Sequence, residues 1–396
     1  MRLRDFVIIA AVLLFPFVPS ASAATAAGSS GKATYVLTPG QTTDIDTLAA
    51  TLVAEGVEVV GLLGEVGRLI VNTERDVGEL LVLPGVEAVR PSIGLIPSLS
   101  ESTHVVESDV AADLGYTGAG KAVVVIDSGV ETSHPALAEA VIHEACFLHG
   151  TAGGVCPGSG EVSGVGPGSA APCVSSAVRC AHGTHVAGIV ASRDDNRPGV
   201  ARGATIIAIR VMAENGSIGS AGVLAALDHV ASLATSYDIV AVNMSLGTFR
   251  NPCTDPDMSA AVAGLADLDI AVIAASGNGP FTAVAYPACL PGIIAVGSSE
   301  LEGAGRIVSD FTGYEGDLDF VAPGRSIEST VTAAEDPTGF AQKTGSSMAV
   351  PHLAGALAGL VDLLPGLRLL VAEVLQAVRQ EVHVGLGPLA SSLGLQ

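Results

Sequence analysis

Residues 122–128, Ala-Val-Val-Val-Ile-Asp-Ser, begin the part of the chain whose pattern decides the fold. An unbroken apolar run of this length is typical of a strand that is buried on both faces. Such strands occur in parallel sheets that helices cover on both sides. Asp127 ends the run, and open α/β sheets place their active sites at the carboxyl ends of the strands. The stretch therefore predicts an α/β fold with a functional carboxylate at Asp127.

Further short apolar runs follow, with helical stretches between them. Helices expected over 221–235 and 257–266 would supply the crossovers that parallel strands need. We therefore expect a doubly wound, mostly parallel sheet with helices on both faces. Residues 150–176 are rich in Gly, Ser and Pro and indicate a surface insertion held by disulfides. The other expected strands are 205–211, 239–243, 270–275 and 293–296.

The first 23 residues have the pattern of a secretory signal peptide. Arg2 and Arg4 precede the apolar run 6–18, and Ala21-Ser22-Ala23 offers a cleavage site between small residues. A membrane anchor is the alternative, but the run is interrupted by proline and is shorter than the roughly 20 residues that a membrane-spanning helix needs. We expect a secreted protein, extracellular or periplasmic, with no stable membrane association.

Residues 24–100 are expected to form a small module and a linker, and residues 101–396 the main domain. Between Lys32 and Ile93 the order of stretches is β-α-β-β-α-β, as in ferredoxin-like α+β folds. Polar residues 97–102 lack periodicity and indicate a linker that a protease could reach. The expected strands of the module are 34–37, 57–63, 68–72 and 86–93, and its expected helices are 44–55 and 74–83.

Composition and cysteine content are consistent with a secreted protein. The chain has 396 residues, with 18 Lys and Arg against 40 Asp and Glu, and its net charge of −22 argues against a nucleic-acid partner. Six cysteines lie beyond the signal, and an even number in a secreted chain indicates disulfides. A zinc site is the alternative, but no C-x-x-C pair is present. Sequence does not fix the pairing, and we favour neighbours: Cys146 with Cys156, Cys173 with Cys180, and Cys253 with Cys289.

Three motifs supply the groups of a nucleophilic active site. Asp127 ends a strand, His182 opens a helix of small residues, and Ser347 lies at the start of another helix. A serine hydroxyl needs a base to take its proton, and an imidazole base needs a carboxylate on its other nitrogen. The positive end of the helix would favour Ser347 as a nucleophile, and we place Pro351 in the first turn of that helix. Taken singly, each motif also fits a turn, a helix start or core packing, and His185 is assigned to packing.

The chain order Asp127, His182, Ser347 and the motifs around these residues resemble the subtilases, the subtilisin and proteinase K group of serine endopeptidases. The resemblance covers residues 114–360. It implies a protease that hydrolyses peptide bonds of proteins through an acyl-enzyme and needs no cofactor for chemistry. The module would be an inhibitor-like propeptide, an intramolecular inhibitor that the enzyme removes by cleaving its own zymogen between Leu95 and His104. We expect a monomer.

The resemblance also assigns an oxyanion hole. Asn278 matches the asparagine whose side-chain amide donates to the oxyanion together with the Ser347 N–H. Ser346 stands where the family usually has Thr, and Ser276 where it usually has Ala. Because Gly279 follows Asn278, no charge is expected at the rim of the pocket that takes the residue before the cleaved bond. We therefore expect an apolar or aromatic residue there.

Substrate binding would follow the family pattern, in which an extended peptide adds as a strand between two enzyme edges. Ser245-Leu246-Gly247 resembles one edge and Gly216-Ser217-Ile218 the other, with Ile218 in place of the usual Gly. Ala275, Ser276 and Gly277 would line the pocket for the residue before the cleaved bond.

Metal ligands are not fixed by the sequence. Residues 194–196 (Asp-Asp-Asn) and the pair Asp255 and Asp257 offer the oxygen ligands that calcium prefers, although solvated loop carboxylates explain them as well. Structural calcium is therefore left open.

An inactive scaffold and an esterase are the alternative functions. An inactive subtilase scaffold that only binds or inhibits needs a missing triad residue, and none is missing. An α/β-hydrolase esterase needs a G-x-S-x-G elbow and the order Ser, Asp, His, and the chain has neither.

Overall fold

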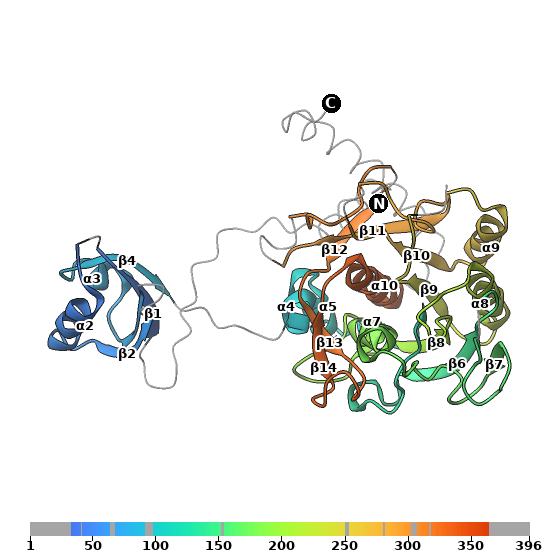
Figure 1. Cartoon of the computed structure of the whole chain (residues 1–396), viewed down its shortest axis with the longest axis horizontal. Helices are drawn as coiled ribbons and strands as arrows, with labels where there is room; N and C mark the ends of the chain where they lie inside the picture. The colour runs from blue at the N-terminus through green and yellow to red at the C-terminus, as the bar shows by residue number, and fades with distance from the viewer. Residues whose placement is uncertain are drawn as a thin grey trace. The chain divides into compact units, whose positions relative to one another are not determined.

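The computed structural model describes residues 33–363, except 41, 64–67, 92–97, 152–153, 250–252, 280–281, 302–306 and 317. The chain forms two compact units, Met1–Ile96 and Pro97–Gln396. The expected signal peptide and the residues after 363 lie outside the described residues. Figure 1 labels the helices and strands of both units.

The N-terminal unit is a four-stranded antiparallel sheet in the order β2-β3-β1-β4 with two helices. Its chain order is the expected β-α-β-β-α-β. Along β3, buried Leu69, Val71 and Thr73 alternate with half-buried residues, so one sheet face packs in a core. Asp44 caps the first helix, and Asp76 caps the second. The elements are β1 (Ala33–Pro39), α2 (Ile45–Ala54), β2 (Glu58–Leu63), β3 (Arg68–Thr73), α3 (Val77–Leu81) and β4 (Val86–Pro91).

The larger unit contains an eight-stranded sheet in the order β12-β11-β10-β9-β5-β8-β6-β7. All neighbours pair in parallel except β6 and β7, which are antiparallel. The apolar run that ends at Asp127 is the central strand β5. The strands are β5 (Ala122–Asp127), β6 (Val141–Phe147), β7 (Ser163–Val165), β8 (Thr205–Arg210), β9 (Ile239–Met244), β10 (Ala271–Ala275), β11 (Ile293–Ser299) and β12 (Phe320–Pro323).

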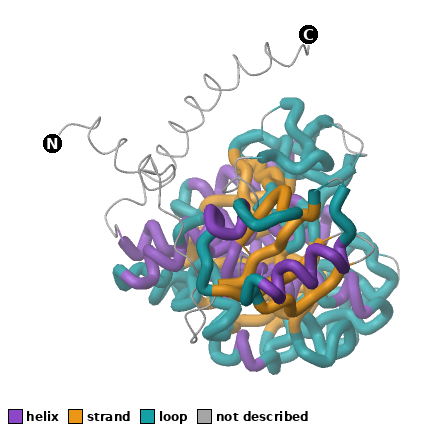
Figure 2. Tube along the Cα trace, turned by 90° about the vertical axis from the view of Figure 1, so that its left-hand side faces the viewer, coloured by secondary structure: helices purple, strands orange, loops and turns teal. Residues whose placement is uncertain are grey.

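Helices cover both faces of this sheet. Val123 and Val125 of β5 pack in one core with α7 (His182–Ala191) and α10 (Ser346–Leu363). Alternate residues of β5 pack on the opposite face in a second core, with α8 (Ser220–Leu233) and α9 (Pro256–Ala266). The helices surround the strands in Figures 1 and 2. The expected doubly wound α/β fold is therefore confirmed.

Several elements have no clear sequence signal. Strand β6 is buried only in part and carries His143 and Glu144, so its apolar pattern is broken. The hairpin β13 (Ile327–Thr330) and β14 (Phe340–Lys343) and the short edge strands β7 and β12 were also not expected. The smaller helices are α5 (Ser108–Asp113), α6 (Ala177–Cys180) and a 3-10 turn, Pro135–Leu137.

All three favoured disulfides are present. They join Cys146 to Cys156, Cys173 to Cys180, and Cys253 to Cys289. The first two flank the insertion expected over 150–176, which contains the edge strand β7.

The linker expected over 97–102 is wrong for most of its length, because helix α4 spans Ser98–Val105. Ser102 and Thr103 are buried, and the Ser102 hydroxyl donates to His352 Nε2 at 2.7 Å. His352 lies far along the chain, so no local pattern could reveal that these polar residues belong to the larger unit.

Helix α10 is long and apolar enough to cross a membrane by length and composition alone. In the structure, 61% of its apolar window is buried inside the larger unit. It is thus a core helix of this unit.

Candidate active site

Asp127 and His182 lie together at the carboxyl end of β5. His182 Nδ1 donates to Asp127 Oδ1 at 2.8 Å and lies 3.0 Å from Oδ2, and the Asp127 carboxylate is buried. Ser128 joins the strand end to α7, because its hydroxyl accepts the N–H of Gly183 at 2.9 Å. A side chain at Gly183 would overlap the Gly129 carbonyl oxygen, so only glycine allows this approach.

Burial and several neighbouring charges shift the pKa of His182. Burial lowers the pKa of the imidazole, but the charge and hydrogen bond of Asp127 raise it by more, and the pKa lies above the ordinary histidine value. The Lys343 charge lowers this pKa, while Glu335 raises it. Lys343 and Glu335 form a nearly buried ion pair at 2.7 Å. His182 is therefore held where it can accept a proton.

Ser347 is the second residue of α10 and is tied to the end of β9. Its hydroxyl donates to the Ser245 carbonyl oxygen at 3.0 Å, and the Ser245 hydroxyl donates to the Ser347 carbonyl oxygen at 2.7 Å. Pro351 lies in the second turn of α10, not in the first as expected, because the helix begins at Ser346. Proline has no N–H, so the Ser347 carbonyl lacks its usual intrahelical donor, and Ser245 replaces it.

Asn278 follows β10 and is fixed by Ser346. Asn278 Oδ1 accepts the Ser346 N–H at 2.7 Å and the Ser346 hydroxyl at 3.0 Å. The same hydroxyl accepts the Gly277 N–H at 3.2 Å. With Oδ1 engaged, Nδ2 can donate at the start of α10, where first-turn N–H groups have no intrahelical partner. Serine at 346 thus keeps the hydroxyl that the family pattern usually takes from threonine.

The strand order brings the expected substrate-binding segments together at the carboxyl ends of the central strands. Residues 275–277 begin at the last residue of β10, and residues 245–247 and 216–218 come after β9 and β8. Asp127 ends β5, which lies between β9 and β8. Ile218 bridges to Met212, and Asn215 Oδ1 accepts the Ser217 N–H at 2.9 Å. The two expected edges therefore lie on opposite sides of the strand that carries Asp127.

Comparison with known proteins identifies the family. The model of the subtilase family matches residues 118–382. The chain belongs to the subtilase family. It is a serine-type endopeptidase, a hydrolase that acts on proteins or peptides.

Two similar proteins come from Bacillus subtilis (strain 168). This subtilase is 30% identical over 289 residues to the "Major intracellular serine protease", and the match covers 71% of this chain and 80% of that protein. It is 32% identical over 250 residues to Subtilisin E of the same strain, covering 62% of this chain and 56% of that protein. Among solved structures, Sphericase matches with TM-score 0.53 and 28% identity over 67% of this chain and 82% of its own.

No sequence pattern indicated that Arg210 supports the turn that carries residues 216–218, an expected substrate-binding edge. The side chain is 1% exposed, and it donates to the Met212 and Ala171 carbonyl oxygens at 2.8 and 2.9 Å. Its third contact is Glu214 Oε1 at 2.9 Å. Arg210 thereby braces the turn that carries residues 216–218. The signal that could have shown it was an arginine at the end of an otherwise apolar strand.

His185 has a structural position, as expected. It is fully buried, and Nε2 lies 3.0 Å from the Ile327 carbonyl oxygen and 3.1 Å from that of Ala341. Burial lowers its pKa to about 3, so the ring is neutral. It fastens α7 to the β13–β14 hairpin.

The carboxylates considered for calcium are engaged in local caps. Asp194 Oδ1 accepts the N–H groups of Asn196 and Arg197 at 3.0 and 2.9 Å. Asp255 caps α9 through Met258 N–H and accepts the Tyr286 hydroxyl. In the described part of the chain, no three His, Cys, Asp or Glu side chains are grouped as a metal site.

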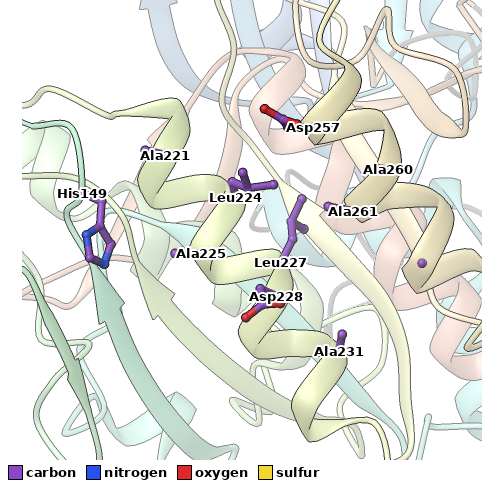
Figure 3. Close-up of a pocket in the computed structure, with 11 residues that line it drawn as sticks. His149, Ala221, Leu224, Ala225, Leu227, Asp228, Ala231, Asp257, Ala260 and Ala261 are labelled. Atoms are coloured by element: carbon purple, nitrogen blue, oxygen red, sulfur yellow. The ribbon is translucent and has the colours of Figure 1, made fainter.

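A groove of about 790 Å³ lies between α8 and α9 (Figure 3). It is on the sheet face opposite to α7 and α10, which carry His182 and Ser347. It is therefore separate from the expected catalytic residues. Its lining residues are His149, Ala221, Leu224, Ala225, Leu227, Asp228, Ala231, Asp257, Ala260, Ala261 and Gly264.

Proposed function

We propose that this subtilase cleaves peptide bonds through an acyl-enzyme on Ser347. The hydrogen bond between Asp127 and His182 carries the proposal, because it leaves Nε2 of His182 as the proton acceptor. Ser347 Oγ turns from the Ser245 carbonyl, gives its proton to His182 and attacks the substrate carbonyl carbon. His182 then protonates the leaving amine. Water next attacks the acyl carbon and gives a proton to His182, which returns it to Ser347 Oγ as the acid product leaves.

The developing oxyanion accepts hydrogen bonds from the Ser347 N–H and Asn278 Nδ2. Both donors are fixed before the substrate binds, Asn278 by its bonds to Ser346. Preorganised donors of this kind typically contribute about 10²- to 10³-fold each to turnover. The peptide lies extended between residues 216–218 and 245–247 and adds to them as a strand.

We propose that the N-terminal unit is an inhibitory propeptide. It is a compact unit with its own hydrophobic core, as a segment that is removed after folding requires. Ser102 is bonded to His352 of the larger unit, so the cleavage lies on the N-terminal side of Ser102.

We also propose secretion, with signal-peptide removal, and a monomeric mature enzyme. The three disulfides support an oxidising compartment. Because one relative is named an intracellular protease, the compartment needs its own test.

The proposed steps use only a hydroxyl, an imidazole, a carboxylate and amide donors, so they need no cofactor. EDTA is therefore expected to leave initial turnover unchanged. Calcium in a surface loop would appear as a lower melting temperature in EDTA.

Expression of wild type and Ser347→Ala, with Ser232→Ala as an exposed-serine control, tests the proposal. Wild type and control are expected in the medium with a new N-terminus before Ser102, and with a burst of product from a peptide p-nitroanilide. Ser347→Ala is expected to stay a longer precursor without activity. Equal processing of Ser347→Ala would overturn self-cleavage, and wild type retained in the cytoplasm would overturn secretion.

A further inference from the structure

The pocket for the residue before the cleaved bond is expected beside residues 275–277, and residues 245–247 are one expected edge of the substrate site. Gly277 and Gly247 are the glycines of these two segments. Both glycines face Ala285: a Cβ built on Gly277 would lie 2.9 Å from Ala285 Cβ, and one on Gly247 would lie 3.6 Å from it. Ala285 is buried, so its methyl group lies between the two walls.

The ring of Phe249 occupies this same space. A Cβ on Gly277 would lie 2.5 Å from Cζ and 3.1 Å from Cε1 of Phe249. The ring edge is thus in contact with the Gly277 backbone, on the side that faces Ala285. We call the space between Gly277, Gly247 and Ala285 the slot. An aromatic substrate ring in the slot would need the volume that the Phe249 ring fills, and two rings cannot share it.

Described residues before and after Phe249 are bonded to the stretch that carries Ala285. Thr248 and Tyr286 exchange two backbone hydrogen bonds, of 2.8 and 3.0 Å. Farther along the chain, Cys253 forms a disulfide with Cys289, and Asp255 accepts the Tyr286 hydroxyl at 2.9 Å. The backbone directly before the ring is thus held by Tyr286.

We propose that Phe249 is the specificity-determining residue of this pocket and restricts the residue before the cleaved bond to small side chains such as alanine. This inference rests on the proposed function and narrows the sequence-based expectation of an apolar or aromatic residue there to a small apolar one. The room left beside Ala285 suits a methyl group, whereas a larger side chain must displace the ring or bind outside the slot.

The test compares two succinyl-Ala-Ala-Pro-Xaa p-nitroanilides, with Xaa alanine or phenylalanine, after counting active sites with a fluorophosphonate. Wild type is expected to show kcat/KM at least about tenfold higher for alanine, a discrimination typical of a pocket that is too small. Phe249→Ala empties the slot and is expected to reverse the order. Phe249→Trp keeps it filled and is expected to keep the preference for alanine. Phe147→Ala is the control, because that ring packs on His149 and His229.

Wild type that prefers the phenylalanine peptide, or an unchanged ratio in Phe249→Ala, would overturn the inference while leaving the protease mechanism intact. Wild type that takes no fluorophosphonate label and cleaves neither peptide would overturn the proposed function and this inference with it.

Discussion

Ser245 and Ser347 are hydrogen-bonded to each other twice, each hydroxyl donating to the other residue's carbonyl oxygen at 2.7 and 3.0 Å. The pair joins the end of β9 to the start of α10. It also accounts for Pro351, because the proline frees the Ser347 carbonyl that Ser245 then satisfies. The position of Ser347, the proposed nucleophile, is thus set by a residue more than a hundred positions earlier in the chain.

Ser245→Ala is expected to destabilise the larger unit by about 1–3 kcal/mol, because it leaves the Ser347 carbonyl and the buried Asn243 side-chain amide without this partner. Urea unfolding in a Ser347→Ala background, which prevents self-digestion, measures the change. The exposed Ser232→Ala should cost less than about 0.5 kcal/mol. Equal midpoints for both variants would contradict the role given to Ser245.

Asn278→Ala is expected to lower kcat by about 10²- to 10³-fold with little change in KM, since it removes a donor that acts in the transition state. Ser346→Ala removes only one bond to Asn278 Oδ1 and is expected to lower kcat by a smaller factor, while Ser346→Thr should restore it. Steady-state kinetics on one peptide p-nitroanilide decides this. A loss confined to KM would speak against an oxyanion role.

Activity is expected to fall at acidic pH with an apparent pKa above the ordinary histidine value of about 6.5, because Asp127 raises the pKa of His182 and the protonated ring cannot act as a base. Lys343→Met removes a charge that lowers this pKa and leaves Glu335, which raises it. The acid limb of kcat/KM should therefore move to higher pH. Lys121→Met, which breaks a different ion pair with Asp238, is the control and should not move it. A shift toward lower pH would contradict the assignment.

His352 should make stability depend on pH. Burial lowers its pKa to about 4 in the folded protein. Below about pH 6.5 the unfolded chain therefore binds a proton that the folded chain does not, and the stability contributed by neutral His352 is lost as pH falls toward 4. Wild type should lose about 2–3 kcal/mol more than His352→Leu over this range, and His104→Leu, at an exposed site, should behave as wild type. Parallel pH profiles for wild type and His352→Leu would refute this.

The central strands could be predicted because their signal is local. The apolar run that ends at Asp127 is continuous, and it became the central strand with alternate residues in two cores. Edge strands such as β7 and β12 lack this signal, since partial exposure mixes polar and apolar residues.

The burial of helix α4 and the position of Asn278 depend on residues that are distant in sequence. Ser102 is buried because of His352, and Ser346 matters because of Asn278. Phe249 shows the same limit: Gly279 indicated only that no charge stands at the pocket rim, while the ring that contacts Gly277 comes from another loop. Pattern and spacing cannot show such contacts.

Labelling of the purified protein with a fluorophosphonate, followed by peptide mapping, tests whether Ser347 is the nucleophile. One adduct is expected, on Ser347, and it should be lost in His182→Ala and retained in the exposed-serine variant Ser232→Ala. Label on another serine, or equal labelling after His182→Ala, would contradict it.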